Sequence, residues 1–245
     1  MLTKNQLKRI ISLRQKKYRL KQQLFIAEGP KVIFEFLNSN YELVEIFSTS
    51  QNYNQFKAKF NIISEEELNK ISLLTTPNKL LAIFKIPQPL KVDTSKLILA
   101  LDEINNPGNL GTIIRLCDWF GVKDLVCSNN TVDCYNYKVV QSAMGSHIRV
   151  NISYVDLEYF LEKSSNVIGT FTESKNSIYE TQLPSSSSVI VLGNEANGIS
   201  SKIASKINMG LAIPRFGTQK KAESLNVANS AAIILSEFKR KTIER

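Results

Sequence analysis

The residues that could carry chemistry concentrate in three segments of the second half of the chain, where glycine is interspersed with polar side chains. These are residues 105–115, residues 191–199, and residues 213–217 together with 223–227. Each lies at or just after the end of a predicted strand. Ligands of α/β folds bind beyond the carboxyl ends of parallel strands, and glycine lets the backbone approach a ligand closely. One such junction would be a tight turn, but three of them predict one shared binding site.

Several common catalytic signatures are missing from the sequence. No G-x-G-x-x-G follows the first predicted strand of either half, and there is no G-x-x-x-x-G-K-[ST], which argues against Rossmann dehydrogenases, Rossmann-type methyltransferases and P-loop NTPases. His147 is the only histidine, and its neighbours include no acid that could orient it, so we expect a structural role. The three cysteines show no C-x-x-C spacing, which predicts reduced thiols and no zinc site.

Taken together, the three segments resemble the signature motifs of the SpoU (TrmH) family of RNA ribose 2′-O-methyltransferases, within the SPOUT superfamily. The first motif reads N-N-P-G-N-L-G-T-I-I-R, the second V-L-G-N-E-A-N-G-I, and the third I-P-R-F-G followed by E-S-L-N-V. Residues 138–145 resemble the family's segment between the first two motifs, and the resemblance extends over residues 97–238. More loosely, the first third resembles the family's accessory α/β substrate-binding domain, which F-I-A-E-G-P at residues 25–30 would open.

The resemblance implies a deep trefoil knot in the C-terminal domain and S-adenosylmethionine bound there in a bent form. Carried over to this sequence, the cofactor-binding residues are Leu192, Gly193, Ile213, Ser224 and Leu225. The catalytic residues carried over are Arg115, Asn109, Glu195, Ser224 and Asn226. Because an arginine with a pKa above ~12 is a poor base, we expect Arg115 to hold phosphate and to stabilise the developing alkoxide.

Three features depart from the family pattern, one of which is that Met144 and Ser146 replace small residues often seen near Gly145. Arg215 stands where methionine is frequent, and residues 218–222 lengthen the loop inside the third motif. Arg215, Lys220 and Lys221 could therefore add phosphate contacts. The positions expected to bind the cofactor are unaffected.

Strands and helices alternate along the sequence, which predicts an α/β fold. We expect strands at residues 24–27, 43–47, 80–86, 97–101, 125–127, 150–153, 167–170, 189–192 and 211–213. We expect helices at residues 3–21, 31–37, 51–60, 112–120, 137–143, 156–163, 200–207 and 224–239, and one opening at Ser64 with a capping box to Glu67. The prediction is a small RNA-binding domain at residues 1–90, a linker at 91–96, and a methyltransferase domain with a parallel sheet at 97–245.

The positive charge of the chain lies at its ends. The net charge of the 245 residues is +9, of which residues 1–31 contribute +8 and residues 239–245 contribute +3, leaving −2 for the rest. A clustered basic segment favours a polyanion, and nucleic acid is the first choice. The cations predicted to contact RNA are Lys8, Arg9, Arg14, Lys16, Lys17 and Arg19. A membrane surface is a weaker option, and no apolar run approaches the ~18 residues of a membrane span.

The function implied by the resemblance is methyl transfer from S-adenosylmethionine to a ribose 2′-hydroxyl of structured RNA, with ribosomal RNA favoured over tRNA. The family is dimeric, so we expect a homodimer, without a metal ion. Because no secretory signal is visible, we expect a cytoplasmic protein. The alternatives are a non-catalytic RNA-binding protein that keeps the fold, against which the intact motifs argue, and an RNA base methyltransferase, against which E-S-L-N-V argues.

Overall fold

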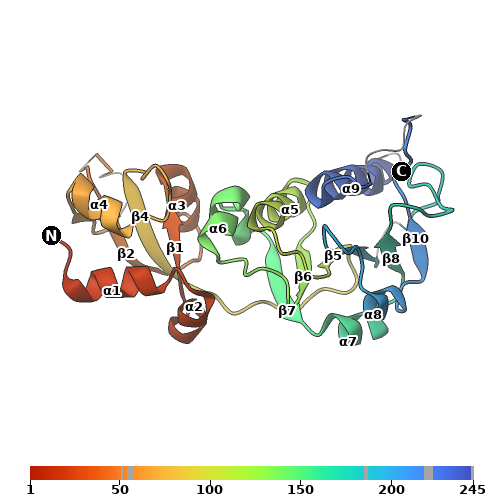
Figure 1. Ribbon diagram of the computed structural model, residues 1–245, viewed down its shortest axis with the longest axis horizontal. Coiled ribbons are helices and arrows are strands. Elements are labelled where there is room, and N and C mark those ends of the chain that lie inside the picture. Colours follow the sequence, from red (N-terminus) through yellow and green to blue (C-terminus); the bar gives the residue numbers. More distant parts are fainter. Residues whose placement is uncertain (51, 54–57, 185–186, 218–222, 244–245) are drawn as a thin grey trace. The chain divides into compact units, whose positions relative to one another are not determined.

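The computed structural model describes residues 1–50, 52–53, 58–184, 187–217 and 223–243. The chain divides into two compact units (Figure 1). The first unit comprises Met1–Gln88 and Asp133–Ile148, and the second comprises Pro89–Val132 and Arg149–Arg245. The segment Asp133–Ile148 therefore belongs to the first unit, although it lies between the first and second motifs in the sequence. None of the described helices has the length and apolar character needed to cross a membrane.

A four-stranded mixed sheet forms the centre of the first unit. Its strands are β1 (Leu24–Glu28), β4 (Leu80–Lys85), β2 (Leu43–Ser48) and β3 (Asn61–Ile62), in that order. The first three pair in antiparallel fashion, and β3 runs parallel to β2. The helices of this unit are α1 (Lys4–Ser12), α2 (Lys16–Gln22), α3 (Pro30–Leu37), α4 (Glu65–Ile71), α6 (Tyr137–Ala143) and the 3₁₀ turn η1 (Ser146–Ile148).

Both faces of this sheet are covered by apolar side chains, and all five residues of β1 are buried. Ile10 of α1 and Leu68 of α4 belong to one apolar cluster, together with Ile26. The other cluster gathers Phe25, Phe36 and Phe84, and Val140 of α6 belongs to it. Helix α6 thus completes the core of the first unit, which explains why its segment belongs there.

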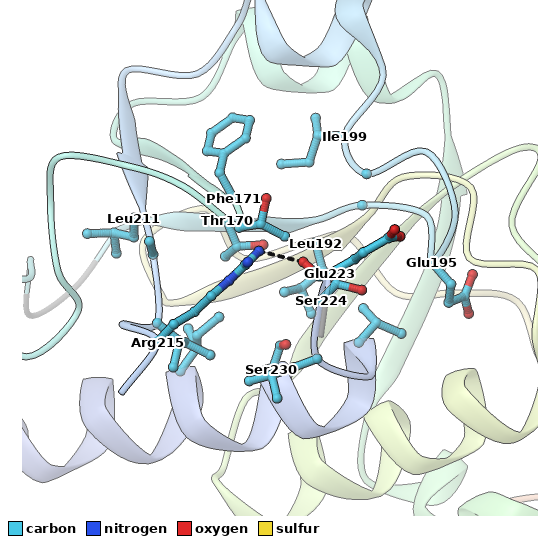
Figure 2. Close-up of a pocket in the computed structure, with 18 of the residues that line it drawn as sticks. Thr170, Phe171, Leu192, Glu195, Ile199, Leu211, Arg215, Glu223, Ser224 and Ser230 are labelled. Carbon is cyan, nitrogen blue, oxygen red and sulfur yellow. Dashed lines mark hydrogen bonds between the residues drawn. The ribbon is translucent and has the colours of Figure 1, made fainter. Parts of the chain in front are cut away.

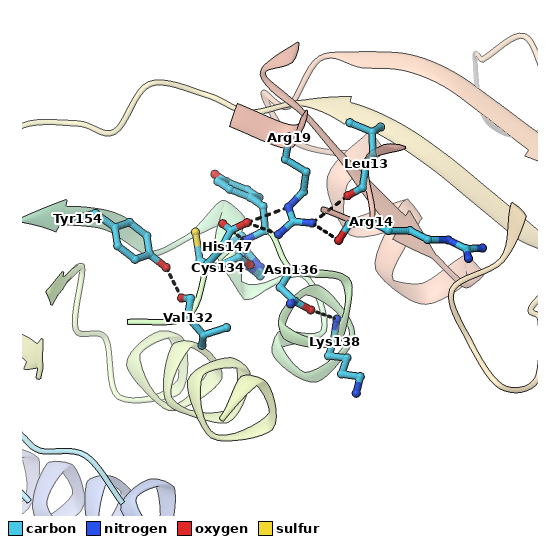
Figure 3. A network of polar contacts seen from close by, with 11 residues as sticks. Leu13, Arg14, Arg19, Val132, Cys134, Asn136, Lys138, His147 and Tyr154 are labelled. Carbon is cyan, nitrogen blue, oxygen red and sulfur yellow. Dashed lines mark hydrogen bonds and ion pairs between the residues drawn. The ribbon is translucent and has the colours of Figure 1, made fainter. Parts of the chain in front are cut away.

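The predicted helix at residues 3–21 is wrong, because two helices occupy this region. Thr3 caps α1 as predicted, but the chain leaves the helix after Ser12 and is extended at Gln15. The buried guanidinium of Arg19 donates hydrogen bonds to the carbonyl oxygens of Leu13 at 2.8 Å and Arg14 at 2.9 Å (Figure 3). These bonds satisfy carbonyl groups that the end of α1 leaves without helical partners. Half of the predicted helix at residues 51–60 lies outside the described residues, and the described half, residues 52–53 and 58–60, is not helical.

The second unit contains a six-stranded parallel sheet. In spatial order its strands are β10 (Met209–Leu211), β8 (Val167–Thr170), β9 (Val189–Leu192), β5 (Ile98–Leu101), β6 (Asp124–Ser128) and β7 (Asn151–Val155). Its helices are α5 (Pro107–Trp119), α7 (Leu157–Glu162), α8 (Ser201–Ala204) and α9 (Val227–Ile243). The chain proceeds from β5 to β6 and β7 on one side, and places β9, β8 and β10 on the other. Strand order therefore reverses at β5.

Both bounds of β8, β9 and α6 were predicted correctly, whereas four other elements of the sequence prediction need correction, of which α8 ends at Ala204, three residues before the predicted end. Helix α5 begins at Pro107 because Asn106 accepts hydrogen bonds from the backbone of Gly108 and Asn109. The glycines of the first motif are therefore helical and do not form the expected loop. Strand β10 ends at Leu211, two residues before the predicted end. Helix α9 begins at Val227, three residues later than predicted.

Candidate active site

A cleft of about 900 Å³ opens at the carboxyl ends of three adjacent strands (Figure 2). Thr170, Leu192 and Leu211 are the last residues of β8, β9 and β10, and all three line it. The second and third motifs supply most of the remaining wall. The parallel sheet thus brings together two segments that lie about twenty residues apart in the sequence. This size is in the range of sites for small organic ligands.

The second motif forms a tight loop that depends on Gly193. Asn194 and Gly198 exchange two backbone hydrogen bonds of 2.9 Å, and Gly198 has a positive φ of 67°. A Cβ atom on Gly193 would lie 2.2 Å from the backbone of Gly198 and Ile199. Only glycine fits here, because backbone atoms at that distance cannot yield without reshaping the loop.

A chain of side-chain hydrogen bonds joins all three motifs. Asn109 donates to the Glu195 carboxylate at 2.8 Å, and Asn226 donates to the Asn109 side-chain oxygen at 3.0 Å. The Asn226 side-chain oxygen in turn accepts from the backbone of Ala228 and Asn229, which caps α9. The late start of α9 has its cause here, because the capping residue is also the motif asparagine.

The third motif carries its own internal bond. The guanidinium of Arg215 donates to the carbonyl oxygen of Glu223 at 2.5 Å, which joins the two described parts of the motif (Figure 2). Arg215, Glu223, Ser224 and Leu225 all line the cleft. Leu225 is 51% exposed. Its side chain is therefore available to pack on a bound ligand.

The structure brings together most of the residues that the motifs indicate. The cleft is lined by the five expected cofactor residues and by Glu195. Asn109 and Asn226 join this site through their hydrogen bonds to each other and to Glu195. Arg115 is the exception: it lies on the exposed side of α5 outside the cleft lining, and no ion pair links it to another described residue.

Sequence reasoning missed part of the cleft. Thr170, Phe171, Ile178, Ile199, Ser230 and Ile234 also line it. Thr170 and Phe171 follow the same rule that drew attention to Gly193, since they lie at the carboxyl end of a predicted strand. Gly169 directly precedes Thr170 and was a signal that the sequence analysis did not use.

The lining fits the chemistry of S-adenosylmethionine. Leu192, Ile213 and Leu225 offer apolar surface for a flat base. Gly193 and Ser224 also line the cleft, where their backbone groups can bond to the base edge and the ribose. Among the described residues, no cluster of three or more His, Cys, Asp or Glu side chains could hold a metal ion.

Two of the six predicted RNA-binding cations are held within the first unit. Arg19 is 3% exposed and forms a buried ion pair with Asp133 at 2.6 Å, so its prediction as a phosphate contact is wrong. Burial of a charge requires a partner, and Asp133 provides it. Arg9 pairs with Glu45 in a half-buried position. The other four are exposed: Lys8, Arg14, Lys16 and Lys17. Arg14 also donates a hydrogen bond to the carbonyl oxygen of Ser72.

His147 and the cysteines have the structural character expected of them. His147 is 3% exposed, and its Nε2 lies 2.9 Å from the carbonyl oxygen of Cys134. Burial lowers the pKa of His147 to about 4, so the ring is neutral at neutral pH. Cys117, Cys127 and Cys134 are buried and are not joined in a disulfide, and burial raises the pKa of the Cys117 thiol far above its usual value.

The chain resembles known proteins over nearly its whole length. Residues 96–236 match the SpoU rRNA Methylase family, and residues 4–82 match the MRM3-like substrate binding domain. The 23S rRNA (guanosine(2553)-2'-O)-methyltransferase RlmP of Bacillus subtilis is 31% identical over 230 residues, 91% of each chain.

Solved structures give the same picture. A TrmH-family protein from Porphyromonas gingivalis superposes with a TM-score of 0.88 at 36% identity, covering 98% of this chain and 99% of that one. An AdoMet-bound rRNA methyltransferase from Sinorhizobium meliloti gives a TM-score of 0.84 at 26% identity, with coverages of 98% and 96%. The resemblance drawn from the three motifs is confirmed, and the chain belongs to the SpoU methylase family.

Proposed function

We propose that this protein transfers a methyl group from S-adenosylmethionine to a ribose 2′-hydroxyl of ribosomal RNA. The observation that carries this proposal is the hydrogen-bond chain from Asn226 through Asn109 to Glu195, at the rim of a cleft suited to the cofactor. A decayed, non-catalytic member of the family would have no reason to keep these three polar side chains in register. Ribosomal RNA is favoured over tRNA because RlmP, similar over 91% of both chains, is named for 23S rRNA.

The chain's own residues have two tasks in this reaction. When bound, S-adenosylmethionine supplies an electrophilic methyl group on a positively charged sulfur. Leu192, Ile213 and Leu225 would hold its adenine, and the backbone at Gly193 and Ser224 would fix the ribose and the base edge. Since methyl transfer needs an aligned nucleophile and electrophile, this positioning supplies much of the rate.

Arg115 would act on the RNA side. A guanidinium is always charged and offers five donors, so it can hold a phosphate and stabilise the alkoxide that develops on the ribose. Its exposed position on α5, free of ion pairs with the described residues, leaves it available for RNA. Asn109, six residues earlier on α5, connects this helix to Glu195 and so fixes the helix that presents Arg115.

The remaining expectations belong to this proposal as well. The exposed cations Lys8, Arg14, Lys16 and Lys17 would contact RNA phosphates. We also propose the trefoil knot, which the placement of β9 between β8 and β5 supports. A homodimer and a cytoplasmic location complete it, with a substrate-binding domain at residues 1–90 and a methyltransferase domain at 97–245 from which the segment Asp133–Ile148 is excepted, because it belongs to the first unit.

The test is transfer of labelled methyl groups to RNA from a strain that lacks this gene, offered both as free RNA and as ribosomal subunits. Arg115→Ala should lose on the order of 100-fold in rate, the usual effect of removing one preorganised donor to a developing oxyanion. Lys202→Ala, another exposed cation of the second unit, is the matched control and should retain full activity. Resistance of the labelled site to alkaline cleavage identifies the 2′-oxygen. Cofactor binding without label in either substrate would overturn the proposal.

A further inference from the structure

The chain's single tryptophan, Trp119, is 83% exposed at the end of α5. Tryptophan carries the largest apolar surface of any side chain, and an indole left in water forgoes a large gain from burial. The rest of α5 shows no shortage of core, since Leu110, Ile113, Ile114 and Cys117 are fully buried. The exposure of Trp119 therefore needs a reason outside the packing of this unit.

Trp119 lies on the same face of α5 as Arg115. The exposed positions of this helix are Gly108, Thr112, Arg115 and Trp119, spaced by four, three and four residues. Side chains at this spacing stand in one row along a helix. At 1.5 Å per residue, Trp119 lies about 6 Å further along the axis than Arg115. The row presents a cation and a flat aromatic ring side by side.

The charged residues of α5, of the turn after it and bonded to Asp118 sum to a positive charge, since Arg115, Lys123 and Arg149 stand against Asp118. Lys123, four residues beyond Trp119, is exposed, and Arg149 binds the Asp118 carboxylate at 2.8 Å and 2.9 Å. The acid next to Trp119 is therefore neutralised by its partner. A flat ring among cations fits a nucleic acid, because phosphates pair with the cations while a base stacks on the ring.

A second protein surface fits this row less well. A helix face that docks on another helix presents apolar residues at successive turns. Of the four exposed positions here, Trp119 alone is large and apolar, and Arg115 would become a buried, uncompensated charge. Burial of such a charge is costly.

We propose that Trp119 stacks on an unpaired base of the RNA substrate, beside the nucleotide whose ribose and phosphate Arg115 contacts. The proposal rests on the proposed function, because it uses RNA bound at Arg115. Stacking on an aromatic ring tolerates any base, so Trp119 would select single-stranded over paired RNA and would not read sequence. It would thereby direct Arg115 to a nucleotide in a loop or bulge.

Because Trp119 is the only tryptophan, intrinsic fluorescence reports on this position alone. An unpaired RNA oligonucleotide should quench the emission and protect it from acrylamide, whereas the same sequence in a duplex should do neither. S-adenosylmethionine alone should leave the emission unchanged. Emission that changes with protein dilution and not with RNA would assign Trp119 to a contact between copies of this chain and overturn the proposal.

Variants separate stacking from a general loss of structure. Trp119→Ala should weaken binding of the unpaired oligonucleotide about tenfold. Trp119→Phe should weaken it less, because the phenyl ring can still stack on a base. Tyr159→Ala removes another exposed aromatic ring of the second unit, on α7, and should change nothing. Cofactor affinity should be unchanged in all three variants.

The two proposals fail in different ways. If the wild-type protein methylates RNA while Trp119→Ala keeps the wild-type KM for RNA, the stacking role is wrong and the proposed function stands. If the protein binds the cofactor but labels no RNA or ribosomal subunit, the proposed function is wrong, whatever Trp119 does.

Discussion

The side-chain amide of Asn109 donates a hydrogen bond to the carboxylate of Glu195, 86 residues further along the chain. The same amide accepts a hydrogen bond from Asn226, 117 residues from it. The nitrogen and the oxygen of the Asn109 amide therefore have different partners, which specifies the orientation of the amide. A single asparagine thus fixes α5 against the loop after β9 and the start of α9.

Exchanging the two chemical groups tests this connection. Asn109→Asp keeps the acceptor for Asn226 but replaces the donor toward Glu195 with a second carboxylate oxygen, so two charges of the same sign would meet. We expect methyl transfer to fall by at least tenfold. The double variant Asn109→Asp with Glu195→Gln restores one donor and one acceptor in reversed order and should recover most of the rate. If the double variant is as impaired as the single one, the hydrogen bond does not carry the effect.

Gly193 and Gly217 both line the cleft, but the space around the two glycines differs. A Cβ atom at Gly193 would meet backbone at 2.2 Å, whereas nothing lies within 4 Å of one at Gly217. Gly193→Ala should therefore reshape the second motif and weaken binding of S-adenosylhomocysteine by more than tenfold in calorimetric titrations. Gly217→Ala should bind as the wild type does. Equal affinities in the two variants would contradict the role given to the Gly193 loop.

Arg215 joins the two described parts of the third motif. Arg215→Met leaves the Glu223 carbonyl without this donor, so the segment carrying Ser224 and Leu225 becomes less fixed. We expect the KM for S-adenosylmethionine to rise several-fold with a smaller change in kcat, and Arg215→Lys to recover part of the loss. If the substitution acts by loosening the segment that carries Ser224 and Leu225, the affinities for 5′-methylthioadenosine and S-adenosylhomocysteine should fall by the same factor. A loss confined to the second ligand would mean that Arg215 binds its carboxylate instead.

Arg19 and Lys17 lie on the same helix and should differ in effect. Arg19→Met leaves Asp133 buried without its partner, and we expect about 3–5 kcal/mol of lost stability in denaturant unfolding. Lys17→Ala should change stability by less than about 0.5 kcal/mol, because the side chain is exposed. It should instead reduce the slope of log binding constant against log salt by about 0.7 to 0.9, the value for one phosphate contact.

Local patterns in the sequence were enough to predict the alternation of strands and helices. Both bounds of the buried strands β8 and β9 were predicted correctly. The break at Gln15 was not predictable, because it depends on Arg19 and on Asp133, which is 114 residues further along the chain. The place of α6 in the first unit has the same origin, since Val140 packs among residues of the first third. Motifs identified the residues of the candidate site, but the bond from Asn109 to Glu195 is a tertiary contact.

His147 gives a prediction on pH. Its pKa is about 4 in the folded protein, because burial disfavours the charged ring, and 6.5 is the ordinary value that holds in the unfolded chain. Below about pH 6.5 the unfolded chain takes up a proton that the folded chain refuses, so stability falls as the pH drops toward 4. Between pH 7 and pH 5 this amounts to about 2 kcal/mol.

The measurement compares unfolding free energies of the wild type and His147→Gln at pH 7 and pH 5. Glutamine keeps an amide donor for the Cys134 carbonyl but does not titrate. Carboxylates titrate in both proteins, so only the difference between the two pH dependences reports on His147, the one histidine of the chain. The variant should lose about 2 kcal/mol less than the wild type over this range, even if it is less stable at pH 7. Equal losses would mean that the ring becomes protonated in the folded state, and that its contacts with Tyr135 and Phe36 do not keep it neutral.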